Sequence, residues 1–306
     1  MLRTILRQAV QVVPTLLGIT VLVFLMIHLI PGDPAVLMAG LESSPEVVER
    51  IRADLGLDRP LYVQFWRFLS GALEGDFGTS LRTGAPVLDE IAARLPHTLR
   101  LAVGATLLAT LLGMVTGILA AVWHGRIWDN VIMVLTLLAV STPSYWLALM
   151  LMLVFSLYLG LLPSIGVGTP AHLVLPVLTL GAQSAGIIAR MTRSAMLDVL
   201  RQDYIRTARS KGLGEWPVVL KHALRNALIP VITIVGLRFG GLLAGTVLVE
   251  SVFAIPGIGR LVVDAVLVRD YPMIQGAVLF LATVVIVTNM VVDILYGVVD
   301  PRVRVA

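Results

Sequence analysis

Residues 99–123 read LRLAVGATLLATLLGMVTGILAAVW, a run in which the one charged side chain is Arg100. A helix needs about 20 apolar residues to cross the hydrocarbon core of a bilayer, so this stretch predicts a transmembrane helix. Five more stretches meet the same condition, approximately at residues 9–30, 131–159, 173–188, 227–249 and 275–299. The sequence therefore predicts an all-α polytopic membrane protein with six transmembrane helices.

The composition agrees with a membrane protein and argues against a soluble one. Of the 306 residues, 58% are apolar and 14% are charged, and the mean hydropathy is +0.93. A soluble domain of this length has too little interior to bury so much apolar surface. Cysteine is absent, which excludes disulfides and cysteine metal sites. We read the net charge of +4 as an orientation signal and not as a sign of nucleic-acid binding, because cytoplasmic loops collect Lys and Arg.

The N-terminal apolar stretch predicts a retained helix and not a signal peptide. Arg3 and Arg7 precede it, it is longer than a usual signal core, and Pro31-Gly32-Asp33-Pro34 follows in place of a small-residue cleavage site. If the N-terminus is inside, the basic loop between the fourth and fifth spans is also inside, whereas loop 160–172 outside carries no Lys or Arg. We therefore expect both termini in the cytoplasm.

The long segment after the first span predicts a folded insertion. Ser44-Pro45-Glu46 is typical of a helix start, and amphipathic stretches follow at 61–73 and 86–95. The insertion is either a docking platform for a partner or a cap that only covers the helix ends. We expect three parts: an N-terminal tail and first span at 1–30, an extracytoplasmic helical segment at 31–98, and a membrane core at 99–306 with a cytoplasmic loop at 193–226.

The loop at 193–226 is basic and carries chain breakers between two helical stretches. Gly212, Gly214 and Pro217 separate the stretches, which predicts a helix–turn–helix at the cytoplasmic membrane surface. On charge alone, such a loop is attracted to anionic lipid head groups.

The loop also resembles that of a known family. YIRTARSKG at 204–212, followed by HALRNALIP at 222–230, resembles the EAA loop of ABC importer permeases. The glutamate that names the motif is Arg206 here, and the motif's proline is displaced to Pro230. Further segments are similar to the peptide/nickel branch of that family: PGDP at 31–34, GLDRPLY at 56–62, GDFG at 75–78, PGIGR at 256–260, DYPMIQ at 270–275 and DPR at 300–302. Of the two permeases such systems pair, the chain resembles the one with a long outer segment.

The resemblance implies the permease subunit of an ATP-driven, binding-protein-dependent importer in the bacterial inner membrane. The implied partners are a paralogous permease, two ABC ATPase subunits that hold ATP and Mg²⁺, an extracytoplasmic substrate-binding protein and membrane lipid. The implied substrates are short peptides (dipeptides, oligopeptides or glutathione), with nickel chelates as the alternative. The residues implied to couple to the ATPase are Tyr204, Arg206, Thr207, Ala208, Lys211, Gly212, Leu213 and Gly214.

Signatures of catalysis and of a cofactor or metal held by this chain are missing from the sequence. The histidines form no H-E-x-x-H pair, and neither a G-x-S-x-G elbow nor a G-x-x-x-x-G-K-[ST] phosphate loop occurs. Asp76-Phe77-Gly78 matches a kinase metal motif but lacks the accompanying catalytic loop, so we interpret it as a turn. A passive channel or ion-driven carrier remains as an alternative, although the spans carry few ionisable groups.

Two features of the spans are candidates for the translocation path. Ser141-Thr142-Pro143-Ser144 interrupts the third span and predicts a kink that either lines the path or only packs. Arg238 in the fifth span lies at a depth similar to that of Asn289 in the sixth. It either helps to pass the anionic end of a peptide or forms a buried pair with Asn289 or Asp293.

The fifth span also carries four glycines, which allow close helix approach. We expect this face to meet the equivalent helix of a partner permease, with packing inside this chain as the alternative. The glycines are Gly236, Gly240, Gly241 and Gly245.

Overall fold

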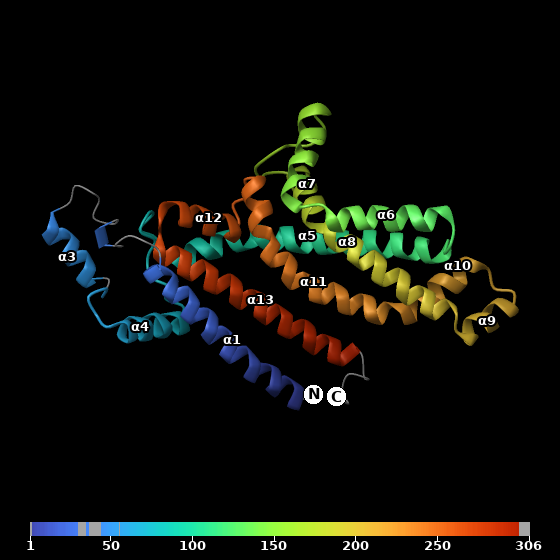
Figure 1. The fold of residues 1–306 in the computed structure, drawn as a ribbon, viewed down its shortest axis with the longest axis horizontal. Helices are drawn as coiled ribbons and strands as arrows, with labels where there is room; N and C mark the ends of the chain where they lie inside the picture. The colour runs from blue at the N-terminus through green and yellow to red at the C-terminus, as the bar shows by residue number, and fades with distance from the viewer. Residues whose placement is uncertain (1, 30–34, 37–43, 55, 300–306) are drawn as a thin grey trace.

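The computed structural model describes residues 2–29, 35–36, 44–54 and 56–299. In this part of the chain the regular elements are helices, and the long ones run side by side (Figure 1). The predicted segments PGDP at 31–34 and DPR at 300–302 lie outside the described residues.

The long apolar helices correspond to the predicted spans. In the described residues, four are long and apolar enough to cross a membrane, and a fifth is possible if a bent pair counts as one. The four are α5 (Val87–Val122), α8 (Ala171–Leu200), the stretch from Glu215 that ends in α11 (Leu224–Val252), and α13 (Tyr271–Val299). Helix α1 (Leu2–Leu29) contributes the shorter apolar stretch Val10–Met26. The prediction of an all-α polytopic fold is confirmed.

The third predicted span is broken rather than kinked. Helix α6 (Ile127–Ser141) is followed by α7 (Ser144–Leu151), which continues into the π-helix η1 (Met152–Tyr158). The bend between α6 and the stretch formed by α7 and η1 is 105°. Thr142 and Pro143 both have extended backbone, because a proline lacks the N–H that a helix needs and pushes the preceding residue out of the helical region. Helix α7 therefore leaves the bundle crosswise (Figure 1).

The second predicted span and the short helix before it form one element. Helix α5 runs through Pro96, where the sequence predicted a break between residues 95 and 99. Ile91 on one side of the proline and Leu101 on the other are both fully buried, so packing holds the helix together across the lost hydrogen bond. The expected boundary at residue 98 thus falls inside a helix.

Helix α8 lies in the middle of the bundle, against α5, α6 and α11. Glycines on α5 allow its close approach: a Cβ on Gly113 or Gly117 would overlap Ile188 or Thr192 of α8. At one end of the bundle lie α3 (Pro45–Asp54), α4 (Leu61–Glu74) and α12 (Ile258–Val268), and at the other end α9 (Asp203–Ser210) and α10 (Glu215–Pro217) (Figure 1).

Two buried carboxylates show what two of the segments noted in the sequence do in the fold, PGIGR at 256–260 and DYPMIQ at 270–275. Glu250 accepts from Thr98 Oγ1 at 2.7 Å and from the backbone N–H of Arg260 at 3.1 Å, so segment 256–260 wraps a carboxylate. Asp270 accepts from Ser80 Oγ at 2.5 Å and from the N–H of Met273 at 3.3 Å. It therefore caps the start of α13 and ties it to the inserted segment.

The remaining local predictions also fit. Helix α3 begins at Pro45, as expected after Ser44. The Asp76-Phe77-Gly78 segment is a turn, in which Asp76 Oδ1 accepts from the N–H of Gly78 at 2.8 Å and Gly78 has φ +78°.

Candidate functional site

Helix α9, in the predicted coupling loop, is seated on the bundle by two small or apolar side chains. Ile205 and Ala208 are buried in one cluster with Met196 of α8 and with Val218 and Val219 of η2 (Val218–Ala223). Ala208 therefore faces inward, so its role is to let α9 lie close to the bundle. The opposite side of the helix stays open.

The turn after α9 is closed by backbone geometry and by an ion pair. Gly212 has φ +79°, a conformation that favours glycine, and its N–H donates to the carbonyl of Arg209 at 2.9 Å. The Arg209 guanidinium donates to both carboxylate oxygens of Glu215, at 3.1 and 2.6 Å. These hydrogen bonds raise the pKa of Arg209, so it stays charged and ties α9 to α10.

The exposed residues of this loop form a surface that we call the coupling crest. It combines basic and apolar side chains: Leu213 is 43% exposed and Trp216 is 54% exposed. Exposed large apolar side chains beside cations are typical of a protein-binding surface. The crest consists of Tyr204, Arg206, Thr207, Lys211, Gly212, Leu213, Gly214 and Trp216.

Sequence reasoning missed four contributors to this loop, which are Arg209, Glu215, Trp216 and Asn226. Arg209 and Glu215 form the closing ion pair, and Asn226 Nδ2 donates to Tyr204 Oη at 2.6 Å. Trp216 could have been found from the sequence, because a tryptophan is unusual in a polar loop. The pairing of Tyr204 with Asn226, 22 positions away, depends on the fold.

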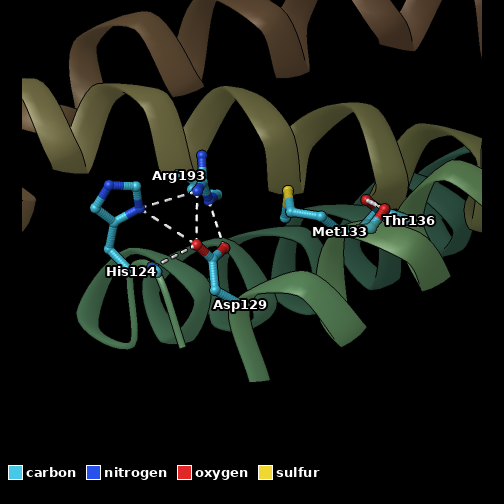
Figure 2. Close-up of polar contacts among 6 residues, drawn as sticks. His124, Asp129, Met133, Thr136 and Arg193 are labelled. Carbon is cyan, nitrogen blue, oxygen red and sulfur yellow. Dashed lines mark hydrogen bonds and ion pairs between the residues drawn. The ribbon is translucent and has the colours of Figure 1, made fainter. Parts of the chain in front are cut away.

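A polar cluster fastens α6 to α8 where the loop at 193–226 begins (Figure 2). Arg193 of α8 donates from Nε and Nη2 to the two oxygens of Asp129, at 2.6 and 2.7 Å. The N–H of Gly125 donates to Asp129 Oδ2 at 3.1 Å, and His124 Nδ1 lies 3.2 Å from the same oxygen. The Asp129 side chain is 2% exposed. This bidentate pair holds the turn between α5 and α6 against the helix that leads into α9.

The candidate path residues come from the bend after α6 and from α11 and α13. Ser141 and Pro143 are exposed at the bend, where Gln183 Nε2 of α8 donates to the carbonyl of Val140 at 3.2 Å. Arg238 is half-buried in α11 and makes no hydrogen bond or ion pair with any residue whose side chain the structure describes. The expected contact of Arg238 with Asn289 is thus not formed, and the side chain of Asp293 lies outside the described residues.

Most of the glycine face of α11 packs inside this chain, as in the alternative given above, and a contact with a second permease stays a prediction. A Cβ on Gly236 would overlap Val292 of α13, and one on Gly240 would overlap Asn289. Gly245 lies against Leu180 of α8, whereas a Cβ on Gly241 would meet open space. Of these four glycines, Gly241 is the one with open space beside it in this chain.

Metal-ligating side chains do not cluster: across the described residues, no group of three or more His, Cys, Asp and Glu could hold an ion.

Known proteins resemble this chain over its whole length. A family model described as "binding-protein-dependent transport system inner membrane component" matches residues 113–305, and its N-terminal companion matches residues 1–102. The glutathione transport system permease protein GsiC of Salmonella typhimurium strain LT2 is 50% identical over 304 residues, which are 99% of each chain. The protein of the same name from Escherichia coli strain K12 is 48% identical over the same length.

Solved structures share the fold at low identity. The MetNI methionine ABC transporter, in inward-facing conformations, has a chain that matches with a TM-score of 0.58 at 19% identity, over 69% of this chain and 96% of that one. A chain of an amino acid ABC transporter matches with a TM-score of 0.52 at 18% identity, over 70% and 94%. The fold is that of type I ABC importer permeases, and this chain belongs to the family of binding-protein-dependent transport system inner membrane components.

Proposed function

We propose that this chain forms one half of the translocation path of an ATP-driven importer for glutathione and related short peptides. The observation that carries the substrate class is the 48–50% identity, over 99% of both chains, to permeases named for glutathione transport. The chain itself is a permease subunit and not the ATPase. ATP and Mg²⁺ would be bound by two separate ATPase subunits.

The coupling crest is the surface we assign to the ATPase, with both termini and α9 in the cytoplasm. Arg206 and Lys211 keep this end basic, as expected on the cytoplasmic side. Leu213 and Trp216 stand out at the tip, where a cleft of another subunit can bury them. ATP binding can then shift the permease between two states only if the ATPase contacts the crest differently with and without nucleotide.

A paralogous permease would complete the path. The arm formed by α7 and η1 leaves the bundle and exposes large apolar side chains, among them Leu157 at 73% and Tyr158 at 76%. A second permease that packs against this arm would bring the bend at Ser141, Thr142 and Pro143 to the space between the subunits. We place the half-buried Arg238, together with Asn289, along the same path.

The inserted segment at 31–98 would be the docking platform for the extracytoplasmic binding protein. Helices α3 and α4 support this role because they lie at the end of the bundle opposite to the coupling crest (Figure 1). Substrate selection would then belong largely to the binding protein.

Uptake by the reconstituted complex tests this function. The chain is co-expressed with its partner permease and ATPases, placed in liposomes with the binding protein, and supplied with labelled glutathione or dipeptide. Uptake that requires both ATP and the binding protein is expected. Uptake without ATP would instead indicate a passive carrier, and uptake of a nickel chelate without peptide uptake would assign the other branch of the family.

A further inference from the structure

A cavity of about 560 Å³ lies at the α4 end of the bundle, away from the coupling crest. Its walls come from the end of α1, the inserted segment and the start of α13, which contribute Phe24, Arg67 and Tyr271, among others. Arg59 also lines it, so two guanidinium groups share this space with one carboxylate, that of Asp76. The lining is therefore net positive.

Some of the polar side chains that line the cavity already form hydrogen bonds within the chain. Gln64 Nε2 donates to the carbonyls of Leu57 and Arg59, at 3.3 and 2.7 Å, and Gln275 Nε2 donates to the carbonyl of Val23 at 3.2 Å. Asp76 Oδ1 accepts from the N–H of Gly78 at 2.8 Å. These side chains are already engaged in building the wall.

Three donors remain for a ligand. The hydroxyl of Tyr271 is buried and has no hydrogen-bond partner among the described residues, although the residue is only 2% exposed. The Arg67 guanidinium likewise has no ion pair or hydrogen bond in the described chain, and Arg59 makes only a loose pair with Asp58 at 3.9 Å. A buried hydroxyl without a partner is costly unless a ligand satisfies it. Two cations and a hydroxyl together select an anion with several acceptor oxygens.

In a membrane spanned by α1 and α13, the cavity would lie at the depth of lipid head groups. Helices α1 and α13 have 28 and 29 residues, which gives lengths of about 42 and 44 Å and matches the ~40–45 Å of a bilayer with its head groups. Phe24 lies five residues from the end of α1 at Leu29, about 8 Å, and Gln275 lies four residues into α13, about 6 Å. At that depth the cavity would belong to the polar boundary layer of the membrane.

Helix α4 has the surface of a helix that lies in that boundary layer. One face packs on α1, where the rings of Phe65 and Phe24 meet edge to face with centroids 5.4 Å apart. A second face exposes Tyr62 at 75%, Trp66 at 69% and Leu73. Aromatic side chains of this kind are enriched where the bilayer meets water. The third face, with Arg67, turns to the cavity, so the cavity opens beside a surface suited to lipid.

We propose that this cavity binds the phosphate of an anionic phospholipid, held by Arg59, Arg67 and the hydroxyl of Tyr271. The phosphodiester oxygens accept from the two guanidinium groups and from Tyr271 Oη, and the acyl chains run along the apolar side of α1. The bound lipid would fasten α4 to the ends of α1 and α13. This site is separate from the translocation path and from the coupling crest.

Native mass spectrometry of the purified complex, with added dioleoyl phosphatidylglycerol or dioleoyl phosphatidylcholine, tests the site. Wild type is expected to retain phosphatidylglycerol in preference to phosphatidylcholine. Arg59→Gln combined with Arg67→Gln should weaken phosphatidylglycerol binding at least about tenfold, since each charge-assisted hydrogen bond contributes that much or more. The matched control, Arg50→Gln combined with Arg82→Gln, removes two exposed arginines of the same segment that do not line the cavity and should bind as wild type.

A second variant keeps the test decisive if the arginine variant folds poorly. Tyr271→Phe removes a hydroxyl that has no partner within the described chain, so it should leave the melting temperature in phosphatidylcholine unchanged and weaken only phosphatidylglycerol binding. Equal phosphatidylglycerol binding by both variants and wild type would overturn the proposal. Displacement of the lipid by inorganic phosphate at the same concentration would assign the cavity to a free anion and would also overturn it. Because the readout is lipid binding, a failure of peptide uptake does not affect this result.

Discussion

At the scale of single residues, some buried charged side chains of this permease have complete sets of partners. Asp129 is the clearest case, since it is buried and accepts from Arg193 through both oxygens. A buried carboxylate is tolerated only when it is paired, so the two residues act as a unit. Because Arg193 begins the loop at 193–226, this pair has a part in placing α9.

Removing either partner should therefore destabilise the complex. We expect Asp129→Asn or Arg193→Gln to cost on the order of 3 kcal/mol, because the remaining group loses its bidentate partner. The melting temperature of the purified complex measures this. Arg190→Gln, an exposed arginine one turn earlier on α8, is the control and should be neutral. If the double variant is as unstable as the sum of the two single variants, the residues do not act as a unit.

Adjacent glycines on α11 should respond in opposite ways. Gly240→Ala places a methyl group against Asn289 and should cost about 1–3 kcal/mol. Gly241→Ala meets open space within the chain and should leave its stability unchanged. Asn289→Ala should relieve the Gly240 substitution, as measured by melting temperature. If Gly240→Ala separates the two permeases without destabilising either, the glycine face belongs to the interface after all.

At the scale of elements, α9 combines a buried side that fixes it and an exposed side that is free to bind. Ala208 belongs to the first side and Leu213, in the following turn, to the second. Substitutions on the two sides should thus fail for different reasons.

Leu213→Ala and Trp216→Ala should weaken retention of the ATPase subunits without changing the melting temperature of the permeases, because both side chains are exposed. Ala208→Leu should instead displace α9 from the bundle and lower the melting temperature, because the larger leucine side chain would overpack the buried cluster around Met196. Co-purification of the ATPase measures the first effect. Leu220→Ala, another exposed leucine of the same segment, is the control. Normal ATPase retention by both crest variants would move the contact elsewhere.

At the scale of the whole molecule, the two ends of the bundle differ in construction. One end carries α3, α4 and α12, and there the buried Asp270 ties the start of α13 to Ser80 of the inserted segment, whereas the other end carries the basic coupling crest (Figure 1). The proposed function requires these ends to face opposite sides of the membrane.

The absence of cysteine allows a direct test of this orientation. Single substitutions Thr83→Cys in the inserted segment and Ser210→Cys at the end of α9 place a thiol at an exposed position at each end. A membrane-impermeant maleimide added to spheroplasts should label Thr83→Cys and leave Ser210→Cys unlabelled until the cells are opened. The reverse pattern would invert the orientation, and with it the assignment of the coupling crest.

The sequence alone determined the class of the protein and the position of its long helices. A run such as residues 99–123 has no other stable environment than a bilayer, so composition and length sufficed to predict the all-α polytopic fold. The glycine-broken loop at 193–226 was also visible, because glycine and proline act locally, at Gly212 and Pro217.

Only the tertiary structure decided which sides of these helices meet. Nothing local distinguishes Gly240, which packs on Asn289, from Gly241, which faces open space. Pro96 and Pro143 are both prolines in apolar helical stretches, yet one helix continues and the other breaks by 105°. The outcome depends on buried contacts to either side, and these come from residues far away in the chain. For the same reason the pairing of Arg193 with Asp129, 64 positions apart, followed only from the packing of α6 against α8.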